Sequence, residues 1–207
     1  NAPMLDIDLG TYPYVTSSSA SIGGIVTGLG VSPHRVGTIF GIVKAYTTRV
    51  GEGPFPTEQL NAIGERLRSV GHEFGATTGR PRRCGWLDLV QVAYTTMVDA
   101  FDSLCLTKLD VLTGLETIKV GRKYLLDGKE LPSMPAEAED LARVEVVYDE
   151  LPGWSEDISK WVRERCVSVV CGPSRSCQRT RGSTWSTSRR CWACRSTSSA
   201  WVREETP

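Results

Sequence analysis

The feature that most constrains the fold is a change of pattern after Lys160. Up to that residue, apolar side chains recur at helix or strand spacing, whereas residues 161–207 are dominated by Ser, Thr, Arg and Cys without such spacing. Charge divides at the same point: residues 161–207 carry nine Arg and three Glu, and the rest holds 15 basic and 21 acidic residues. We therefore expect one folded domain over residues 1–160 and an aberrant, disordered tail over residues 161–207.

The composition narrows the class of protein. A hydrophobic fraction of 40% is ordinary for a globular domain. No run of about 18 apolar residues is present, so the sequence predicts no membrane-spanning helix, and the first residues lack the order of a signal peptide. The chain opens on Asn1 rather than Met, which we interpret as an internal start. The domain's two cysteines, Cys84 and Cys105, fit a reducing compartment without disulfides.

Strands and helices are predicted in alternation over the first 160 residues. Alternating apolar and acidic residues predict a strand over residues 4–8, with Asp6 and Asp8 on one face. Further strands are expected over residues 38–46, 104–106 and 144–148, and a hairpin over residues 119–131 is expected to turn at Asp127-Gly128. Residues 17–30 are expected to form a loop before a helix start at Ser32-Pro33.

Two longer helices complete the prediction. Thr57 is a suitable cap for a helix over residues 57–70, which Gly71 would end. A second helix is expected over residues 88–101, and its apolar residues at burial spacing are Leu89, Ala93, Met97 and Ala100. This order of elements predicts an α/β fold, and we expect its central sheet to be mostly parallel.

The first segment that points to chemistry is residues 75–83, Gly-Ala-Thr-Thr-Gly-Arg-Pro-Arg-Arg. Arginine presents a planar fork that grips carboxylate or phosphate with two hydrogen bonds, and the flanking glycines let backbone approach a ligand closely. The segment therefore indicates an anion site. An ordinary solvated basic loop would contain the same residue types, although Pro81 favours a loop of fixed shape.

A second segment, residues 107–110, follows an apolar strand, which is where open α/β sheets place ligands. Asp110 offers two acceptor oxygens to the ring imino group and the exocyclic amine of guanine, and adenine has no such pair of donors. The aliphatic stem of Lys108 is long enough to cover the base. A Lys-x-Asp sequence also occurs often by chance, so the segment alone leaves a purely structural role open.

Other polar residues give weaker indications. The hydroxyl-rich segment 11–18 suits a phosphate, but an ordinary turn would look the same. We interpret His34 and His72 as structural or surface residues, because neither has a partner at metal-ligand spacing. Cys191 and Cys194 lack the second pair that a zinc site needs. No Gly-x-x-x-x-Gly-Lys-Ser/Thr phosphate loop is present.

Taken in order, these segments resemble the adenylosuccinate synthetase family. The resemblance covers residues 1 to about 160, and Asn1-Ala2 looks like the end of a segment found in eukaryotic members. It rests on residues 5–8, 11–18, 44–51, 53–58, 77–88, 107–110 and 151–154. The family uses GTP to phosphorylate the ring carbonyl oxygen of IMP and then lets the amine of L-aspartate displace that phosphate. The resemblance therefore implies an α/β fold with a nucleotide site like that of P-loop GTPases.

The resemblance also implies which residues bind each substrate. IMP would contact Asn1, Thr16, Val50 and Arg80. Aspartate would lie under a closing loop formed by Ala76, Thr77, Thr78, Gly79, Arg80, Pro81 and Arg82. GTP would contact Arg82, Lys108, Leu109 and Asp110.

Several expectations concern what surrounds these residues. The family's catalytic Asp and His, its phosphate loop and its Mg²⁺ ligands are expected upstream of Asn1, so we expect no catalytic or metal-binding residue here and no activity from this fragment alone. The full-length enzyme is expected to be a homodimer, in the cytoplasm or, in a photosynthetic source, a plastid. We expect no nucleic-acid or membrane partner. A non-catalytic remnant that binds nucleotide or only dimerises remains the alternative.

Residues 161–207 depart from the family, and we hypothesise that they are read out of frame. We assigned GC-rich codons to residues 175–202 and translated them in the frame that begins at the third base of each codon. The resulting amino-acid sequence has a helix-then-strand pattern that ends in Gly-Val-Gly. The family has that pattern at this place. RNA binding through the arginines and tryptophans of the tail is a weaker alternative.

Overall fold

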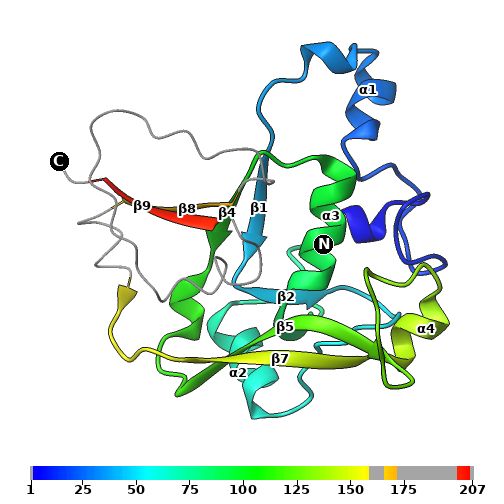
Figure 1. The fold of residues 1–207 in the computed structure, drawn as a ribbon. Coiled ribbons are helices and arrows are strands. Elements are labelled where there is room, and N and C mark those ends of the chain that lie inside the picture. The colour runs from blue at the N-terminus through cyan, green and yellow to red at the C-terminus, as the bar shows by residue number, and fades with distance from the viewer. Residues whose placement is uncertain (1, 159–165, 172–199, 206–207) are drawn as a thin grey trace.

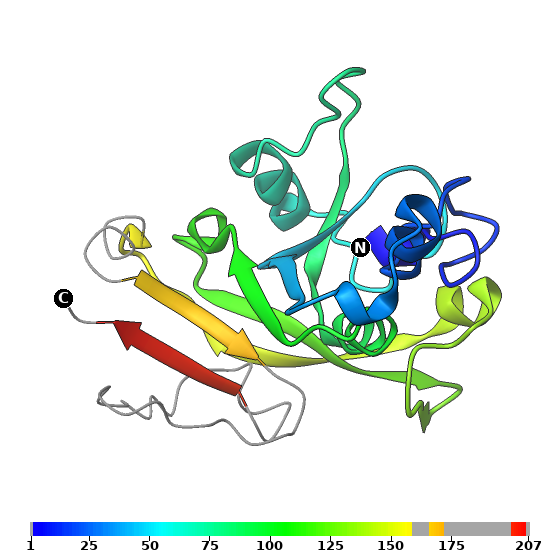
Figure 2. The same cartoon turned by 90° about the horizontal axis from the view of Figure 1, so that it is seen from above.

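The structure, a computed structural model, describes all residues except 1, 159–165, 172–199 and 206–207 (Figures 1 and 2). It confirms an α/β fold. In chain order the elements are η1 Ala2–Leu5, α1 Gly23–Leu29, η2 Pro33–Arg35, β1 Phe40–Lys44, β2 Tyr46–Arg49, α2 Ala62–Val70, β3 Arg83–Asp88, α3 Leu89–Asp99, β4 Ser103–Thr107, η3 Leu109–Leu112, β5 Thr117–Leu126, β6 Lys129–Glu130, α4 Ala138–Arg143, β7 Glu145–Pro152, β8 Cys166–Cys171 and β9 Ala200–Glu205.

The central sheet is mixed, so the expectation of a mostly parallel sheet is wrong for the strands that the structure describes. Five strands form it, in the order β2-β3-β5-β6, with β7 also paired to β5. Only β3 and β5 run parallel in this sheet, while β1 and β4 form a separate parallel pair. The predicted hairpin explains one antiparallel pair, because Asp127 and Gly128 adopt positive φ angles and join β5 directly to β6.

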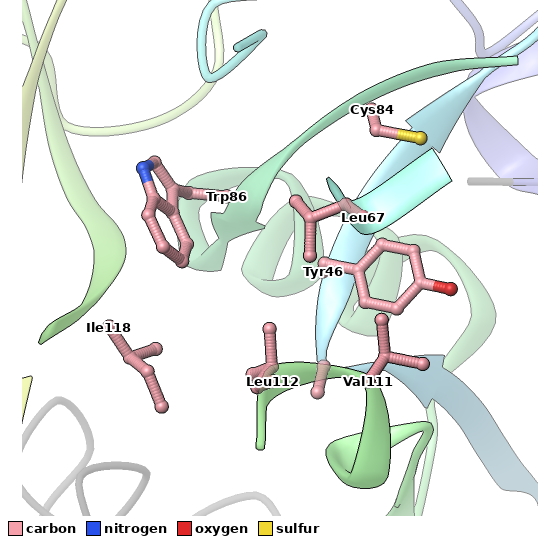
Figure 3. Close-up of a cluster of buried hydrophobic side chains, with 8 residues drawn as sticks. Tyr46, Leu67, Cys84, Trp86, Val111, Leu112 and Ile118 are labelled. Carbon is pink, nitrogen blue, oxygen red and sulfur yellow. The ribbon is translucent and has the colours of Figure 1, made fainter. Parts of the chain in front are cut away.

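A buried apolar cluster joins the elements around the candidate site. Figure 3 shows Tyr46, Leu67 and Trp86 converging with Val111 and Leu112. These side chains come from β2, α2, β3 and η3, so the turn that carries Asp110 is packed against the sheet. The same cluster includes Cys84, and burial raises the pKa of its thiol to about 11. Both Cys84 and Cys105 are free thiols.

The segment 4–8 does not form the predicted strand. Residues Ala2–Leu5 form a short 3-10 helix, after which Asp6 is buried and Asp8 is exposed. The Asp6 carboxylate accepts hydrogen bonds from the amides of Asp8 at 3.0 Å, Ala20 at 2.6 Å and Ser21 at 2.9 Å. The alternating pattern suggested a strand, because a local pattern does not show that the Asp6 side chain bonds to backbone amides 14 and 15 residues away. The predicted loop over residues 17–30 also contains helix α1.

Two other predicted elements have different bounds. The segment 38–46 forms two strands, and Phe40 and Ile42 of β1 are 67% and 76% exposed rather than buried. Helix α2 begins after Asn61, whose side chain accepts from the amides of Ile63 and Gly64. The amide of Trp86 donates to the carbonyl of Thr57 at 3.1 Å, so Thr57 lies against β3 instead of capping the helix.

Helix α3 lies within the predicted range of residues 88–101, with Asp88 as its N-cap, but it does not bury the predicted face. The buried residues are Gln91, Thr95 and Asp99, whereas Ala93, Met97 and Ala100 are exposed. The inward polar groups have partners: Asp99 accepts from the amide of Ile22 at 2.9 Å, and the Gln91 side chain bonds to Tyr124. Polar residues can occupy an inner face when each finds such a partner, which periodicity alone cannot reveal.

Asp88 makes the stability of the fold depend on pH. Its carboxylate caps α3 and accepts a hydrogen bond from the hydroxyl of Tyr124. Burial raises the pKa of Asp88 to about 6, outweighing these hydrogen bonds. The folded state therefore binds this proton more tightly than the unfolded state. The contribution of Asp88 to stability is fully present below about pH 4 and is lost as the pH rises through 6.

We expect Asp88→Asn to remove this pH dependence while keeping the helix cap. Between pH 4 and pH 7 the free energy of unfolding of the wild type should fall by about 2 kcal/mol relative to the variant. Urea unfolding of both proteins at the two pH values measures the difference. Parallel pH profiles would contradict the raised pKa.

The predicted tail is described only in part. Strands β8 and β9 pair antiparallel from Cys166 with Glu205 to Cys171 with Ala200. Cys191 and Cys194 lie outside the described residues. The disorder, the reading-frame origin and the domain boundary assigned to residues 161–207 stay predictions. Among the described residues, no helix is long and apolar enough to cross a membrane.

Candidate functional site

A cavity of about 270 Å³ lies between η1 and the end of β2. The wall combines apolar side chains with the polar groups of Arg82 and Gln91, a combination common in small-molecule sites. The lining residues are Ala2, Met4, Leu5, Thr47, Thr48, Arg49, Val50, Pro54, Phe55, Arg82 and Gln91.

Arg49 gives the wall of this cavity a fixed positive charge. Its guanidinium donates to the hydroxyl of Thr11 at 3.0 Å and to the carbonyls of Tyr14 at 3.3 Å and Glu52 at 3.1 Å. Burial and the nearby charge of Arg83 lower the pKa of Arg49, but arginine remains protonated in proteins at neutral pH. These neutral acceptors leave the charge available to an anion.

The residues predicted to bind IMP are only partly brought together. Val50 lines the cavity, as does Ala2, the neighbour of Asn1, which itself lies outside the described residues. The hydroxyl of Thr16 donates to the carbonyl of Leu5, another lining residue, at 3.0 Å. Arg80 is exposed and is not among the lining residues.

The predicted aspartate loop is an exposed hairpin that projects from the body (Figure 2). Phe74 and Pro81 pair across its base, and the amide of Gly75 donates to the carbonyl of Arg80 at 2.8 Å. Gly79 has a positive φ of 65°, a conformation that glycine adopts without strain. The exposed tip contains Ala76, Thr77, Thr78, Gly79 and Arg80. A base that is fixed and a tip that is exposed suit a loop that closes over a ligand.

The base of this loop is tied to the sheet by Glu73. Its buried carboxylate accepts hydrogen bonds from Lys44 at 2.9 Å, Tyr46 at 2.6 Å and Arg82 at 2.9 Å. Burial raises the pKa of Glu73, but these hydrogen bonds and the charge of Lys44 outweigh it, so the net pKa lies below the usual range. Lys44 also donates to Thr48 of the cavity wall at 2.7 Å.

The residues predicted to bind guanine contact the segment 71–73 through Lys108. Lys108 directly follows β4 and has a positive φ of 61°, and its ammonium donates to the carbonyl of Gly71 at 2.8 Å. Leu109 and Asp110 begin η3. Burial and Glu73 raise the pKa of Tyr46, and the charge of Asp110 adds to this shift, which places Asp110 near Tyr46. Lys108 and Arg82 are therefore both bonded to the short segment 71–73.

Four groups that organise this region were not predicted as site residues: Lys44, Arg49, Glu73 and Gln91. The sequence offered one signal for Lys44, a cation at the end of a strand. In the structure β1 pairs in parallel with β4, which brings Lys44 beside Thr107. Glu73 and Gln91 gave no such signal, since both lie in patterns that also fit a solvated surface. His72, interpreted as structural or surface, is exposed.

No set of three or more His, Cys, Asp or Glu side chains gathers as a metal site in the part of the chain that the structure describes. These residues do not supply a ligand set for Mg²⁺, and we assign no step to the ion here.

Comparison with known proteins places these residues in context. The family model described as adenylosuccinate synthetase matches residues 1–166. Over 160 residues the chain is 63% identical to the adenylosuccinate synthetases of Lodderomyces elongisporus and Coprinopsis cinerea, covering 77% of this chain and 37% of each relative. A solved structure of fully ligated adenylosuccinate synthetase from Plasmodium falciparum superposes with a TM-score of 0.75 at 49% identity, covering 77% of this chain and 39% of that one. The chain thus spans a little over a third of the length of these relatives.

Proposed function

The chain belongs to the adenylosuccinate synthetase family, and we propose that it forms part of an enzyme that joins L-aspartate to IMP with GTP, giving adenylosuccinate, GDP and phosphate. The observation that carries the proposal is the connection between the three predicted binding regions. The segment 71–73 bonds to Lys108 at the guanine end and to Arg82, and Arg82 lines the cavity expected to hold IMP.

In this proposal the cavity holds IMP between Val50 and Arg49, the latter supplying positive charge for the phosphate. The loop tip then closes over aspartate, with Thr77 and Thr78 donating to its carboxylates and Arg80 reaching both substrates. Closing a cationic loop over a dianion pairs charges and excludes water in one motion, which strengthens every electrostatic contact inside. Arg82 would contact the phosphates of GTP, and Lys108, Leu109 and Asp110 its base.

Within this reaction GTP phosphorylates the ring oxygen of IMP, and the aspartate amine displaces that phosphate. Mg²⁺ would neutralise charge on the GTP phosphates, with ligands from the part of the family's sequence outside the match. We also propose a homodimer as the assembled enzyme, and the cytoplasm or a plastid as its compartment.

The test compares two proteins, the 207-residue chain and a chimera in which residues 1–160 replace the matching segment of the L. elongisporus relative. Adenylosuccinate formation is measured with GTP, IMP, aspartate and Mg²⁺. We expect the chimera to turn over within about tenfold of that relative and the 207-residue chain to be inactive. A folded but inactive chimera would favour the alternative, a remnant that only binds nucleotide or dimerises.

A further inference from the structure

Glu73 occupies an unusual position for an acidic residue at the edge of a site for anions. Its side chain is only 3% exposed, and its two oxygens are shared between two cations and one hydroxyl. Oε1 accepts from Lys44 and Tyr46, and Oε2 accepts from Arg82. A carboxylate in such surroundings fixes the positions of its donors, because each would lose a charge-assisted hydrogen bond by moving away.

The backbone around Glu73 also fixes the position of Arg82. The carbonyl of Glu73 accepts from the amide of Arg82 at 2.9 Å, so this residue is held at both its backbone and its side chain. His72, between Gly71 and Glu73, adopts a positive φ of 53°, which is uncommon for a residue other than glycine. The carbonyl of Gly71 thereby meets Lys108 while the carboxylate of Glu73 meets Arg82.

The charges leave this cluster ready for an anion. One carboxylate faces the two cations Lys44 and Arg82, so the three side chains together carry one positive charge. The Nε of Arg82 is buried and has no hydrogen-bond partner. An unpaired buried donor on a cation is costly unless a ligand completes it.

We propose that Glu73 is a positioning residue that holds Lys44 and Arg82 toward an anionic group of the substrates and ties the loop to the guanine end of the site. This inference rests on the proposed function and adds to it a residue that contacts no substrate itself. The anion is a phosphate of GTP or a carboxylate of aspartate, and kinetics with each substrate distinguish the two.

The test uses the chimera with Glu73→Gln and Glu73→Asp, with Glu65→Gln as the matched control. Glu65 also pairs with an arginine, Arg68, but on the exposed surface of α2. Glutamine keeps the shape of Glu73 but removes the charge, whereas aspartate keeps the charge on a shorter stem. We expect Glu73→Gln to raise the KM for one substrate about tenfold with kcat within about twofold, Glu73→Asp to give a smaller rise, and Glu65→Gln to leave both unchanged.

A second measurement does not require activity. Hydrogen exchange of residues 74–82 should be faster in Glu73→Gln than in the wild type and unchanged in Glu65→Gln, because Glu73 holds the base of the loop. A raised KM for GTP alone assigns the cluster to phosphate, and one for aspartate alone assigns it to a carboxylate. Unchanged KM values and unchanged exchange would overturn the inference.

The two proposals fail differently. An inactive wild-type chimera would contradict the proposed function, while the exchange of residues 74–82 would still decide the role of Glu73. An active chimera whose Glu73→Gln variant matches the wild type would contradict only this inference. If Glu73→Gln is not folded at the assay temperature, the KM values and the hydrogen exchange of Glu73→Asp decide the inference in the same way.

Discussion

Replacing Asp6 with alanine is expected to lower the free energy of unfolding by about 4 kcal/mol. The Asp6 carboxylate is fully buried and accepts hydrogen bonds from four backbone amides and one hydroxyl, those of Asp8, Leu9, Ala20, Ser21 and Ser19. Alanine would leave these donors without their acceptor, and an unsatisfied buried donor costs more than the hydrogen bond gained. Urea unfolding at pH 7 measures the loss.

Asp8→Ala is the matched control, because Asp8 is exposed two residues away and its change should stay within about 0.5 kcal/mol. The lowered pKa of Asp6 also makes the stability of the fold depend on pH in the acid range. Burial raises its pKa, but the amide hydrogen bonds outweigh burial and bring the net pKa below the ordinary value. Stability from Asp6 is therefore present above the unfolded pKa of about 4 and lost as the pH falls, opposite in sign to Asp88. Equal losses in Asp6→Ala and Asp8→Ala would contradict the assigned role.

Asp110→Asn in the active chimera is expected to lower kcat/KM for GTP about a hundredfold. The wild-type carboxylate would accept from both the ring imino group and the exocyclic amine of guanine. Asparagine has one acceptor and places a donor opposite one of guanine's donors, so a buried pair is left unsatisfied. Steady-state kinetics with varied GTP at saturating IMP and aspartate measure the effect.

Xanthosine triphosphate sharpens this test, because xanthine has an oxygen where guanine has the exocyclic amine. That oxygen accepts from the asparagine amide, and we expect Asp110→Asn to prefer xanthosine triphosphate over GTP. Asp127→Asn serves as the control, since Asp127 pairs with Arg143 on the surface and tolerates its positive φ as asparagine. A variant at position 110 that keeps its preference for GTP would remove the base-binding role from Asp110.

Elements whose ends carry local signals were predictable from the sequence. Helix α3 begins next to the predicted start at Asp88, and Asp127 and Gly128 form the expected turn, because helix starts and turns depend on residues within a few positions. The segment 4–8 was not predictable, since the partners of Asp6 lie at residues 19–21 as well as nearby. The prediction of the buried face of α3 was wrong for the same reason, because Asp99 accepts a hydrogen bond from the amide of Ile22, which is distant in sequence.

The sequence by itself determined the family, the α/β class and the segments expected to contact IMP, aspartate and GTP, because each segment is contiguous and keeps its order. Only the tertiary structure decided how these segments meet. Lys44 and Tyr46 come from one segment and Arg82 from another, and all three share the carboxylate of Glu73, while Lys108 bonds to Gly71, two residues before Glu73. No local pattern records such a partnership, since a buried acidic residue is stable only where folding brings its cations to it.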